Sequence, residues 1–449
     1  MERLRNDRRT IFGWAMYDWA NSAYITTFGA VTAAFFTDEI VPESGYDLFG
    51  WNVGGQTLWA LVVSIGAAAL FLGMPVLGAI ADFSGAKRRF LRTAALAGAA
   101  VTMLVAFVPA GSVTLFLLLA LVTQIGFVAS NVFYDAFLPA ISTDETIDRV
   151  SSRGFAFGYV GGGLYLVLVL VVVLLSGDDS VTGFSEDTAF RIGIAGSGVW
   201  WAGFTLFALS RLPEPGQAQP LPAAYAGRRR SRAYVELGFR RTIDTGRKLL
   251  GFRQLMLFVV AFIFYNDGTQ TVIAISGAYA EDTLNLEVET IAVAFLIVQF
   301  VAFGGALLFG ALADRAGAKK AIMGSLIVWS LLAIVAFFLP EGRALPFFGL
   351  AAVVGVVLGG VQALSRSLYG TMIPEEASAE FFGFFSVFSK FSAIWGPLVF
   401  ALVSGIMDSG RPAIVSIVFF FVVGFVLLAR VDVDEARASR QRWDFADSA

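Results

Sequence analysis

Gly78-Ala-Ile-Ala-Asp-Phe-Ser-Gly-Ala-Lys-Arg88 and Gly310-Ala-Leu-Ala-Asp-Arg-Ala-Gly-Ala-Lys-Lys320 are two copies of nearly the same sequence. They begin at residues 78 and 310 of a 449-residue chain, so each half carries one copy. Each copy follows a long apolar run and ends in a basic cluster. This pattern predicts a tight turn between two membrane helices, in which glycine allows backbone angles that a Cβ disfavours.

The charged residues of these turns predict contacts with a neighbouring helix. Each aspartate falls where one helix ends, so its carboxylate can meet a neighbouring helix N-terminus or a basic side chain. The basic residues then hold the turn on the cytoplasmic side. An ordinary polar loop is the alternative for one copy alone, and the recurrence at matching places favours a structured turn.

The composition excludes most classes of soluble protein. The chain is 57% hydrophobic and 15% charged, and its mean hydropathy is +0.74, which is typical of a polytopic membrane protein. It contains no cysteine and no histidine, which excludes disulfides and the usual zinc sites. We therefore expect no metal and no cofactor, no nucleic-acid partner, and proton carriers that are carboxylates.

The apolar runs predict twelve membrane spans in two bundles of six. We expect an N-terminal bundle over 1–209, a cytoplasmic linker over 210–253, a C-terminal bundle over 254–430 and a cytoplasmic tail over 431–449. The spans are expected near 11–36, 56–81, 90–108, 112–137, 154–176, 189–209, 254–280, 289–313, 320–339, 346–370, 381–406 and 412–430. Within the linker, residues 234–250 are compatible with a membrane-surface amphipathic helix and equally with a solvated tether.

The distribution of basic residues predicts the orientation. Of the 32 lysines and arginines, 27 lie in the N-terminal segment, the linker, the tail and the loops on the same side as these. Basic residues concentrate on the cytoplasmic side of a membrane protein. Both termini and the linker are therefore expected in the cytoplasm.

The two turns resemble the signature loop of the major facilitator superfamily, which recurs between helices 2 and 3 and between helices 8 and 9. The second copy fits the family pattern, and the first departs at Phe83, where the family usually has arginine. The resemblance implies an all-α fold of two six-helix bundles, in which this loop gates between inward-open and outward-open states. Together with an acidic residue near the end of the fourth span, the expected gating residues are then Asp82, Gly85, Lys87, Asp135, Asp314, Arg315 and Gly317.

Polar residues within the predicted spans are candidates for a binding site. An ionisable side chain at the centre of a span costs about 2.5–3.5 kcal/mol on insertion scales, so it needs a partner or a water-filled cavity. Structural hydrogen bonding, helix packing or snorkelling to the interface is the alternative for each. The candidates for binding solute or proton are Tyr17, Asp18, Asn21, Asn131, Tyr134, Asn266, Asp267, Gln270, Gln362, Arg366 and Lys390.

Three of these candidates have expected partners or roles. Asp267 lies deep in the seventh span and is the best proton-carrier candidate. Lys390 lies about ten residues into the eleventh span, too deep to snorkel easily, so we expect a partner carboxylate such as Asp267 or an anionic group of the solute. Arg366 is expected to hold Asp135 or the solute.

A narrower resemblance rests on Gly13-Trp-Ala-Met-Tyr-Asp-Trp-Ala-Asn-Ser-Ala-Tyr24, Gln362-Ala-Leu-Ser-Arg-Ser-Leu-Tyr369 and the region from Glu380 to Pro397. These stretches are similar to the Atg22-like vacuole effluxers, whose prokaryotic members are grouped as UMF1-type permeases. The fungal relatives are associated with amino-acid efflux from the vacuole, which implies a small amino acid or similar solute here. Paired opposite charges in the cavity would also suit a zwitterion.

Together these observations predict a monomeric secondary transporter in a prokaryotic plasma membrane. We expect proton-coupled or facilitative movement of a small polar solute by alternating access. A lipid or lysolipid translocase on the same fold and a non-transporting sensor are the alternatives. A membrane-embedded enzyme is disfavoured, because the chain lacks histidine, cysteine and a nucleophile–base motif.

Overall fold

Helices and one short hairpin make up the part of the chain that the structure describes. The structure is a computed structural model that describes residues 5–177, 183–214, 218–219, 225 and 229–443. The first half contains α1 (Arg8–Thr27), η2 (Phe28–Thr32), α2 (Ala33–Phe35), η3 (Phe36–Ile40), β1 (Tyr46–Leu48), β2 (Trp51–Val53), α3 (Gly55–Ser84), α4 (Lys87–Val105), α5 (Val113–Asp135), α6 (Leu138–Ile141), α7 (Ile147–Leu174) and α8 (Glu186–Leu209). The strands β1 and β2 pair antiparallel.

The second half follows a linker helix, α9 (Arg230–Leu249). It contains α10 (Arg253–Ala278), η5 (Tyr279–Thr283), α11 (Val288–Ala316), α12 (Ala318–Phe337), α13 (Ala344–Met372), η6 (Glu375–Ala377), α14 (Ser378–Phe391), α15 (Trp395–Met407), α16 (Gly410–Ser416), α17 (Val418–Ala429), α18 (Val433–Ser439) and η7 (Arg440–Arg442). Helical segments therefore occupy all twelve stretches in which the sequence predicts a span. The break between α14 and α15 interrupts the stretch 381–406.

By length and apolarity, fewer than twelve of these helices qualify as membrane spans. In the described residues nine do so, or ten if the two parts of α3, which meet at an angle of 42°, count as one span. The helix α1 carries polar side chains that it buries against other helices, and α4 begins with Lys87 and Arg88. Both features lower mean hydropathy without preventing a helix from crossing a bilayer. The count of twelve crossings stays a prediction.

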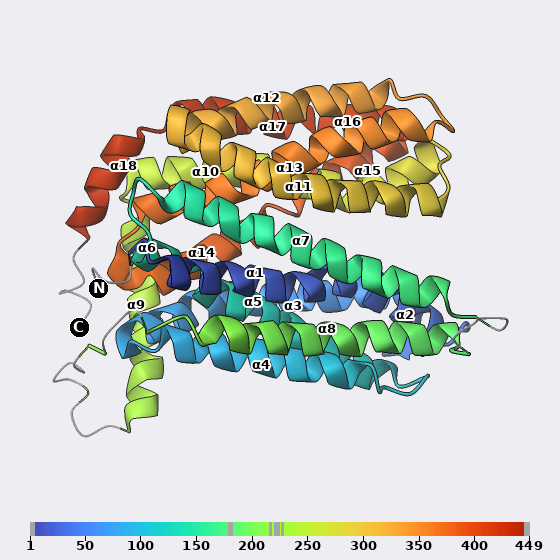
Figure 1. Ribbon diagram of the computed structural model, residues 1–449, viewed down its shortest axis with the longest axis horizontal. Coiled ribbons are helices and arrows are strands. Elements are labelled where there is room, and N and C mark those ends of the chain that lie inside the picture. Colours follow the sequence, from blue (N-terminus) through green and yellow to red (C-terminus); the bar gives the residue numbers. More distant parts are fainter. Residues whose placement is uncertain (1–4, 178–182, 215–217, 220–224, 226–228, 444–449) are drawn as a thin grey trace.

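The helices form two groups that lie side by side. In Figure 1, α10 to α13 and α15 to α17 lie in the upper group, and α1, α3, α4, α5 and α8 lie in the lower one. Contacts between the groups run from α7 to α11 and α13, and from α14 to α3 and α5. The boundaries of two separate bundles at residues 209 and 254 stay a prediction.

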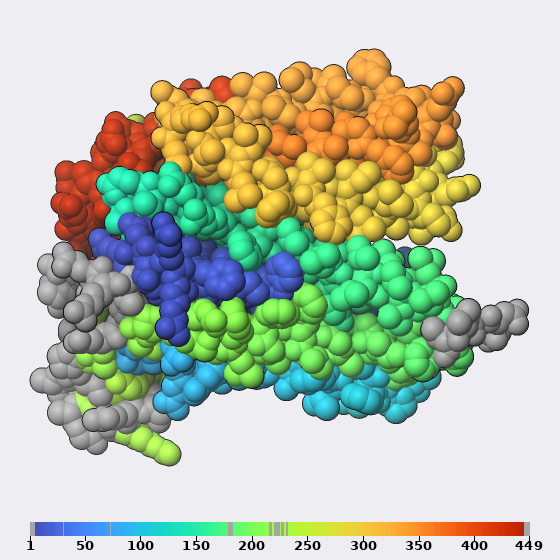
Figure 2. All heavy atoms as spheres, in the orientation of Figure 1, coloured from blue at the N-terminus to red at the C-terminus, as the bar shows by residue number. Residues whose placement is uncertain are grey.

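The two ends of the molecule differ. One end, called here the basic end, carries α9, α18 and the first turn of α1 (Figure 1). At this end α14 packs against α3, whereas α15 packs against α10 and α16. Figure 2 shows the two groups in close contact near the basic end and a notch between them at the opposite end.

Glycines allow α11 and α13 to pack backbone to backbone. A Cβ placed on Gly305 of α11 would meet the backbone of Val356, and one placed on Gly359 of α13 would meet the carbonyl oxygen of Ala302. Small residues at a helix interface are the usual means of close association in lipid. The same helix α13 also contains Gly349, where a Cβ would meet nothing within 4 Å.

We expect Gly359→Ala to destabilise the protein relative to Gly349→Ala. Both changes alter helix propensity alike, so their difference isolates the clash with Ala302. Overpacking a tight interface costs about 1–3 kcal/mol. Thermal unfolding of the purified protein in detergent measures this difference, and equal midpoints for the two variants would show that α11 and α13 can move apart at no cost.

Candidate functional site

A cavity of about 220 Å³ lies between the two groups of helices. Its walls come from α5, α7, α10, α13 and α14. The predicted residues that line it are Asn131, Asp135, Asn266, Gln270, Gln362, Arg366 and Lys390. The other predicted binding residues, Tyr17, Asp18, Asn21, Tyr134 and Asp267, lie outside its lining. A larger hollow of about 860 Å³ opens at the basic end, but loop and tail residues form its walls, so the smaller cavity is the better candidate site.

Amides and aromatic rings form half of the cavity wall. The Gln362 carbonyl oxygen accepts a hydrogen bond of 2.6 Å from the hydroxyl of Tyr159. The Asn131 carbonyl oxygen accepts one of 2.7 Å from the amide nitrogen of Asn21. Five phenylalanines complete the wall: Phe127, Phe155, Phe262, Phe382 and Phe385. Such a wall offers orienting polar groups on a mainly apolar surface, as small-molecule sites do.

Lys390 is a cation in this wall to which the described residues offer no partner. It lies in the last turn of α14 and lines the cavity. In the part of the chain that the structure describes, no hydrogen bond or ion pair is recorded for its ammonium group. The negative end of the α14 dipole favours a cation at this place. The ammonium is therefore available to an anionic group of a ligand.

The predicted pairing of Lys390 with Asp267 is wrong for this structure. Asp267 instead accepts a hydrogen bond of 2.8 Å from the backbone N–H of Gly396, in the first turn of α15. Its neighbour Asn266 donates a hydrogen bond of 2.5 Å to the hydroxyl of Ser392, where α14 ends. The break between α14 and α15 thus separates Lys390 from Asp267. Lys390 lies at the C-terminal end of α14, which carries a partial negative charge, and Asp267 caps the N-terminal end of α15, which carries a partial positive charge.

The predicted partner of Arg366 is present, and a second carboxylate joins it. The guanidinium Nη1 lies 3.0 Å from Asp135 Oδ1 and 3.6 Å from Asp18 Oδ2. Its Nε and Nη2 donate to the hydroxyl and the carbonyl oxygen of Ser151, both at 2.9 Å. The Tyr134 hydroxyl donates to Asp18 at 3.1 Å. This cluster joins α13 of one group to α1, α5 and α7 of the other.

Aromatic rings enclose the Arg366 cluster. The guanidinium carbon lies 4.2 Å from the ring centroid of Phe155 and 4.9 Å from that of Trp14. Trp14 stacks on Tyr134 at 4.4 Å, and Tyr17 packs against Tyr134 at 5.0 Å. Cation–π contacts add to the ion pairs when water is excluded. Tyr17, Asp18 and Tyr134 therefore support Arg366 and do not line the cavity.

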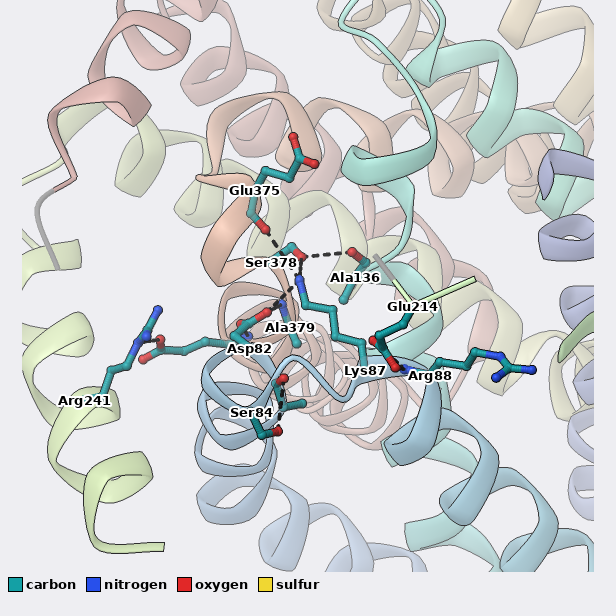
Figure 3. A network of polar contacts seen from close by, with 12 residues as sticks. Asp82, Ser84, Lys87, Arg88, Ala136, Glu214, Arg241, Glu375, Ser378 and Ala379 are labelled. Carbon is teal, nitrogen blue, oxygen red and sulfur yellow. Dashed lines mark hydrogen bonds and ion pairs between the residues drawn. The ribbon is translucent and has the colours of Figure 1, made fainter. Parts of the chain in front are cut away.

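The first predicted gate turn closes the basic end against α14 (Figure 3). Asp82 accepts hydrogen bonds from the backbone N–H groups of Ala379 and Glu380, at 3.2 and 2.8 Å, and pairs with Lys87 at 2.7 Å. Lys87 also donates to the Ser378 hydroxyl at 2.6 Å. The carboxylate thus satisfies N–H groups that the start of a helix leaves without intrahelical partners.

The turn itself has the geometry that its sequence predicts. Gly85 ends α3 with a φ of +59°, in the left-handed region, as a glycine readily does. On the other side of the turn, the Glu214 carboxylate accepts the backbone N–H of Arg88 at 3.2 Å. Burial raises the pKa of Glu214, although these neighbours oppose the shift.

The second gate turn makes a different contact. Asp314 pairs with Arg149 of α7, and Gly317 has a φ of +87°. The side chains of Arg149 and Asp314 are 55% and 24% exposed, so this ion pair contributes less than a buried one. Arg315 is exposed, and no hydrogen bond or ion pair joins it to another residue of the described chain. The structure therefore does not bring Arg315 into the closure.

Sequence reasoning missed the ion pair between Arg241 and Glu380. Arg241 of α9 lies 3.0 Å from Glu380 of α14, and the two side chains are 4% and 0% exposed. Phe83, where the family resemblance expects arginine, packs instead with Tyr234 and Leu237 of α9. Ser151, Tyr159 and Ser378 were also missed. Hydroxyl groups are common in membrane spans, so the sequence alone does not single these three out. They are recognised as part of the site only by their hydrogen bonds to Arg366, Gln362 and Lys87.

Comparison of sequences identifies the family. The family model described as "Vacuole effluxer Atg22 like" matches residues 6–441. The chain is 31% identical over 420 residues to the uncharacterized MFS-type transporter YxiO of Bacillus subtilis, covering 93% of this chain and 94% of that one. It is 27% identical over 283 residues to autophagy-related protein 22-2 of Aspergillus clavatus, and the match spans 45% of that longer protein.

Comparison of structures gives the fold. The proton:xylose symporter XylE superposes with a TM-score of 0.69 at 15% identity, covering 96% of this chain and 98% of that one. The transporter FucP in its outward conformation superposes with a TM-score of 0.68 at 13% identity, covering 95% and 99%. The expectations of the major facilitator fold and of a transporter rather than an enzyme are confirmed. The chain is an integral membrane protein that belongs to the Atg22-like vacuole effluxer family of the major facilitator superfamily.

Proposed function

We propose that this transporter moves a small polar solute with an anionic group, and that amino acids are the first class to test. The solute binds in the cavity between the two groups of helices, and the protein exposes that cavity to each side of the membrane in turn. The transporter works as a monomer in a prokaryotic plasma membrane. Movement is coupled to protons or driven by the solute gradient alone.

The observation that carries this proposal is the ammonium of Lys390 in the cavity wall, which makes no hydrogen bond or ion pair with the residues that the structure describes. The other cation of the wall, Arg366, is already bonded to Asp18, Asp135 and Ser151. A carboxylate of the solute therefore finds one available cation, with amide groups of Gln362 and Asn131 nearby. A solute amine finds the excess negative charge of a cluster with two carboxylates and one guanidinium.

We infer the conformational state from the closed end of the molecule. Asp82, Lys87 and Arg366 all join the two groups at or near the basic end, and the notch lies at the other end. We assign the basic end to the cytoplasm because most basic residues lie there. In this assignment the cavity faces outward in the present state.

A lipid or lysolipid translocase is the second candidate. The five phenylalanines of the cavity wall favour it, since an acyl chain needs an apolar lining. An amphiphile of this kind would enter from the bilayer rather than from water. Competition of a water-soluble amino acid for transport therefore separates the two candidates.

We expect Lys390→Gln to weaken solute binding. A hydrogen bond to a charged group contributes about 1.5–3 kcal/mol, which corresponds to an increase in half-saturating concentration of about 10- to 100-fold. Uptake of a labelled amino-acid panel into proteoliposomes measures this change. Lys320→Gln makes the same chemical change at an exposed position outside the cavity and serves as the control. An unchanged half-saturating concentration in Lys390→Gln would contradict the assignment of Lys390.

We expect Asp267→Asn to remove the response of uptake to an imposed pH gradient. The amide oxygen can still accept the N–H of Gly396, so the start of α15 stays capped while the protonatable group is lost. Uptake with and without the gradient is compared with Asp408→Asn, a control at an exposed position where asparagine tolerates the positive φ. Gradient-driven uptake that persists in Asp267→Asn would remove Asp267 from proton coupling. Failure of every amino acid as a substrate would favour the lipid candidate.

A further inference from the structure

The helix α9 lies across the basic end and packs sideways on α3. Figure 1 shows it at a large angle to the long helices. Gly238 lies against Ile80 and the carbonyl oxygen of Val76, within the last turns of α3. The residues of α9 that face the protein recur at intervals of four and are buried: Ala233, Leu237, Arg241, Thr245 and Leu249. The helix α9 therefore lies beside the end of a predicted membrane span.

The opposite face of α9 exposes a stripe of apolar side chains. Val235, Phe239 and Ile243 are 49%, 54% and 53% exposed, and Leu250 just beyond the helix is 73% exposed. At 3.6 residues per turn these positions share one face, turned away from α3. An apolar stripe of this kind, next to a membrane helix, is typical of a helix that lies in the membrane interface.

Arginines flank this apolar stripe on one edge. Arg229, Arg240 and Arg247 are exposed and fall on the same side of the helix. Basic residues beside an interfacial apolar face attract anionic headgroups, with an effect of about fivefold per residue on the docking equilibrium. The charge of this edge and the position of the stripe therefore fit the same partner, an anionic lipid leaflet.

A buried ion pair connects α9 to the closure of the basic end. Arg241 Nε lies 3.0 Å from Glu380 Oε2, and both side chains are buried. The backbone N–H of the same Glu380 bonds to Asp82 of the gate turn. Figure 3 shows Arg241 approaching this network from α9 while Lys87 and Asp82 approach from the turn. The first turn of α14 is thus held by the gate turn and by α9 together.

We propose that α9 is a docking surface for the anionic lipid leaflet at the basic end, and that Arg241 transmits this docking to α14. When Val235, Phe239 and Ile243 are seated in the interface, α9 is fixed in place. Arg241 then holds Glu380, and the closed arrangement of α3 and α14 is favoured. Arg241 is a positioning residue, because it acts through Glu380 and touches no solute.

The lipid contact is tested with single cysteines, because the chain has none of its own. Phe239→Cys carries an environment-sensitive fluorophore in the full-length protein, reconstituted into phosphatidylcholine vesicles with or without phosphatidylglycerol. We expect quenching by spin-labelled lipid and protection from aqueous iodide, with stronger lipid quenching when phosphatidylglycerol is present. Asp434→Cys, at an exposed position of α18, is the control and should be quenched by iodide.

Two results would overturn the lipid assignment. Iodide quenching at position 239 equal to that at position 434 would place the stripe in water. Protection from both quenchers would indicate a protein partner, such as a second copy of the chain. Changing Arg229, Arg240 and Arg247 together to glutamine should abolish the preference for phosphatidylglycerol, and a preference that remains would exclude the basic edge as its cause.

The role of Arg241 is tested by the distance between spin labels at Glu145→Cys and Glu376→Cys, two exposed positions on opposite sides of the closure. In anionic vesicles we expect the distribution of distances between the two spin labels to be dominated by short distances, as in the closed arrangement. The fraction of short distances should fall in Arg241→Gln and recover in Arg241→Lys. If Arg241→Gln fails to fold, Arg241→Gln with Glu380→Gln removes both buried charges and should still lose the dependence on phosphatidylglycerol. Equal distance distributions in the two kinds of vesicle, or in wild type and the double variant, would overturn the coupling.

Discussion

The guanidinium of Arg366 is the interaction on which the closed state depends. A charge placed inside a membrane protein is tolerated only when partners replace its water. Here Asp18, Asp135 and Ser151 come from α1, α5 and α7, whereas Arg366 belongs to α13. The requirement for partners therefore draws the two groups of helices together near the basic end. Removing one partner of such a buried set costs about 3–5 kcal/mol, which is a large fraction of the stability of most proteins.

The gate turns add to this closure unequally, although their sequences are nearly the same. Asp82 is buried and satisfies the first N–H groups of α14 as well as Lys87. Asp314 makes one ion pair, with Arg149, in a partly exposed setting. Since exposed pairs contribute little, the first turn carries most of the closure. The difference arises from what each turn meets, which the repeat in the sequence does not specify.

The parts that could be predicted from the sequence are those with local signals. Apolar runs predict where the helices lie, the duplicated turns predict two tight turns between helices, and the place of Arg366 inside a span predicts a partner such as Asp135. The pair between Arg241 and Glu380 could not be predicted, because it joins residues 139 positions apart across the two groups. The end of α14 after Phe391 is indicated in the sequence by Ser392, Gly396 and Pro397, residue types that disfavour a continuous helix. Without that signal, the sequence predicts Asp267 as one of two possible partners of Lys390, and the structure does not show this pair.

Lys390 and Arg366 line the same cavity, which matters for the proposed transport cycle. In that cycle, opening of the basic end pulls Arg366 away from Asp18 and Asp135, which leaves buried charges that need new partners. A solute bound by Lys390 lies in the same cavity as Arg366 and Asp135. Its own charged groups can replace the partners that are lost as α13 moves away. A solute without those charged groups leaves Arg366, Asp18 and Asp135 without partners when the basic end opens. The groups by which the solute is selected are therefore also the groups that allow the basic end to open and release it.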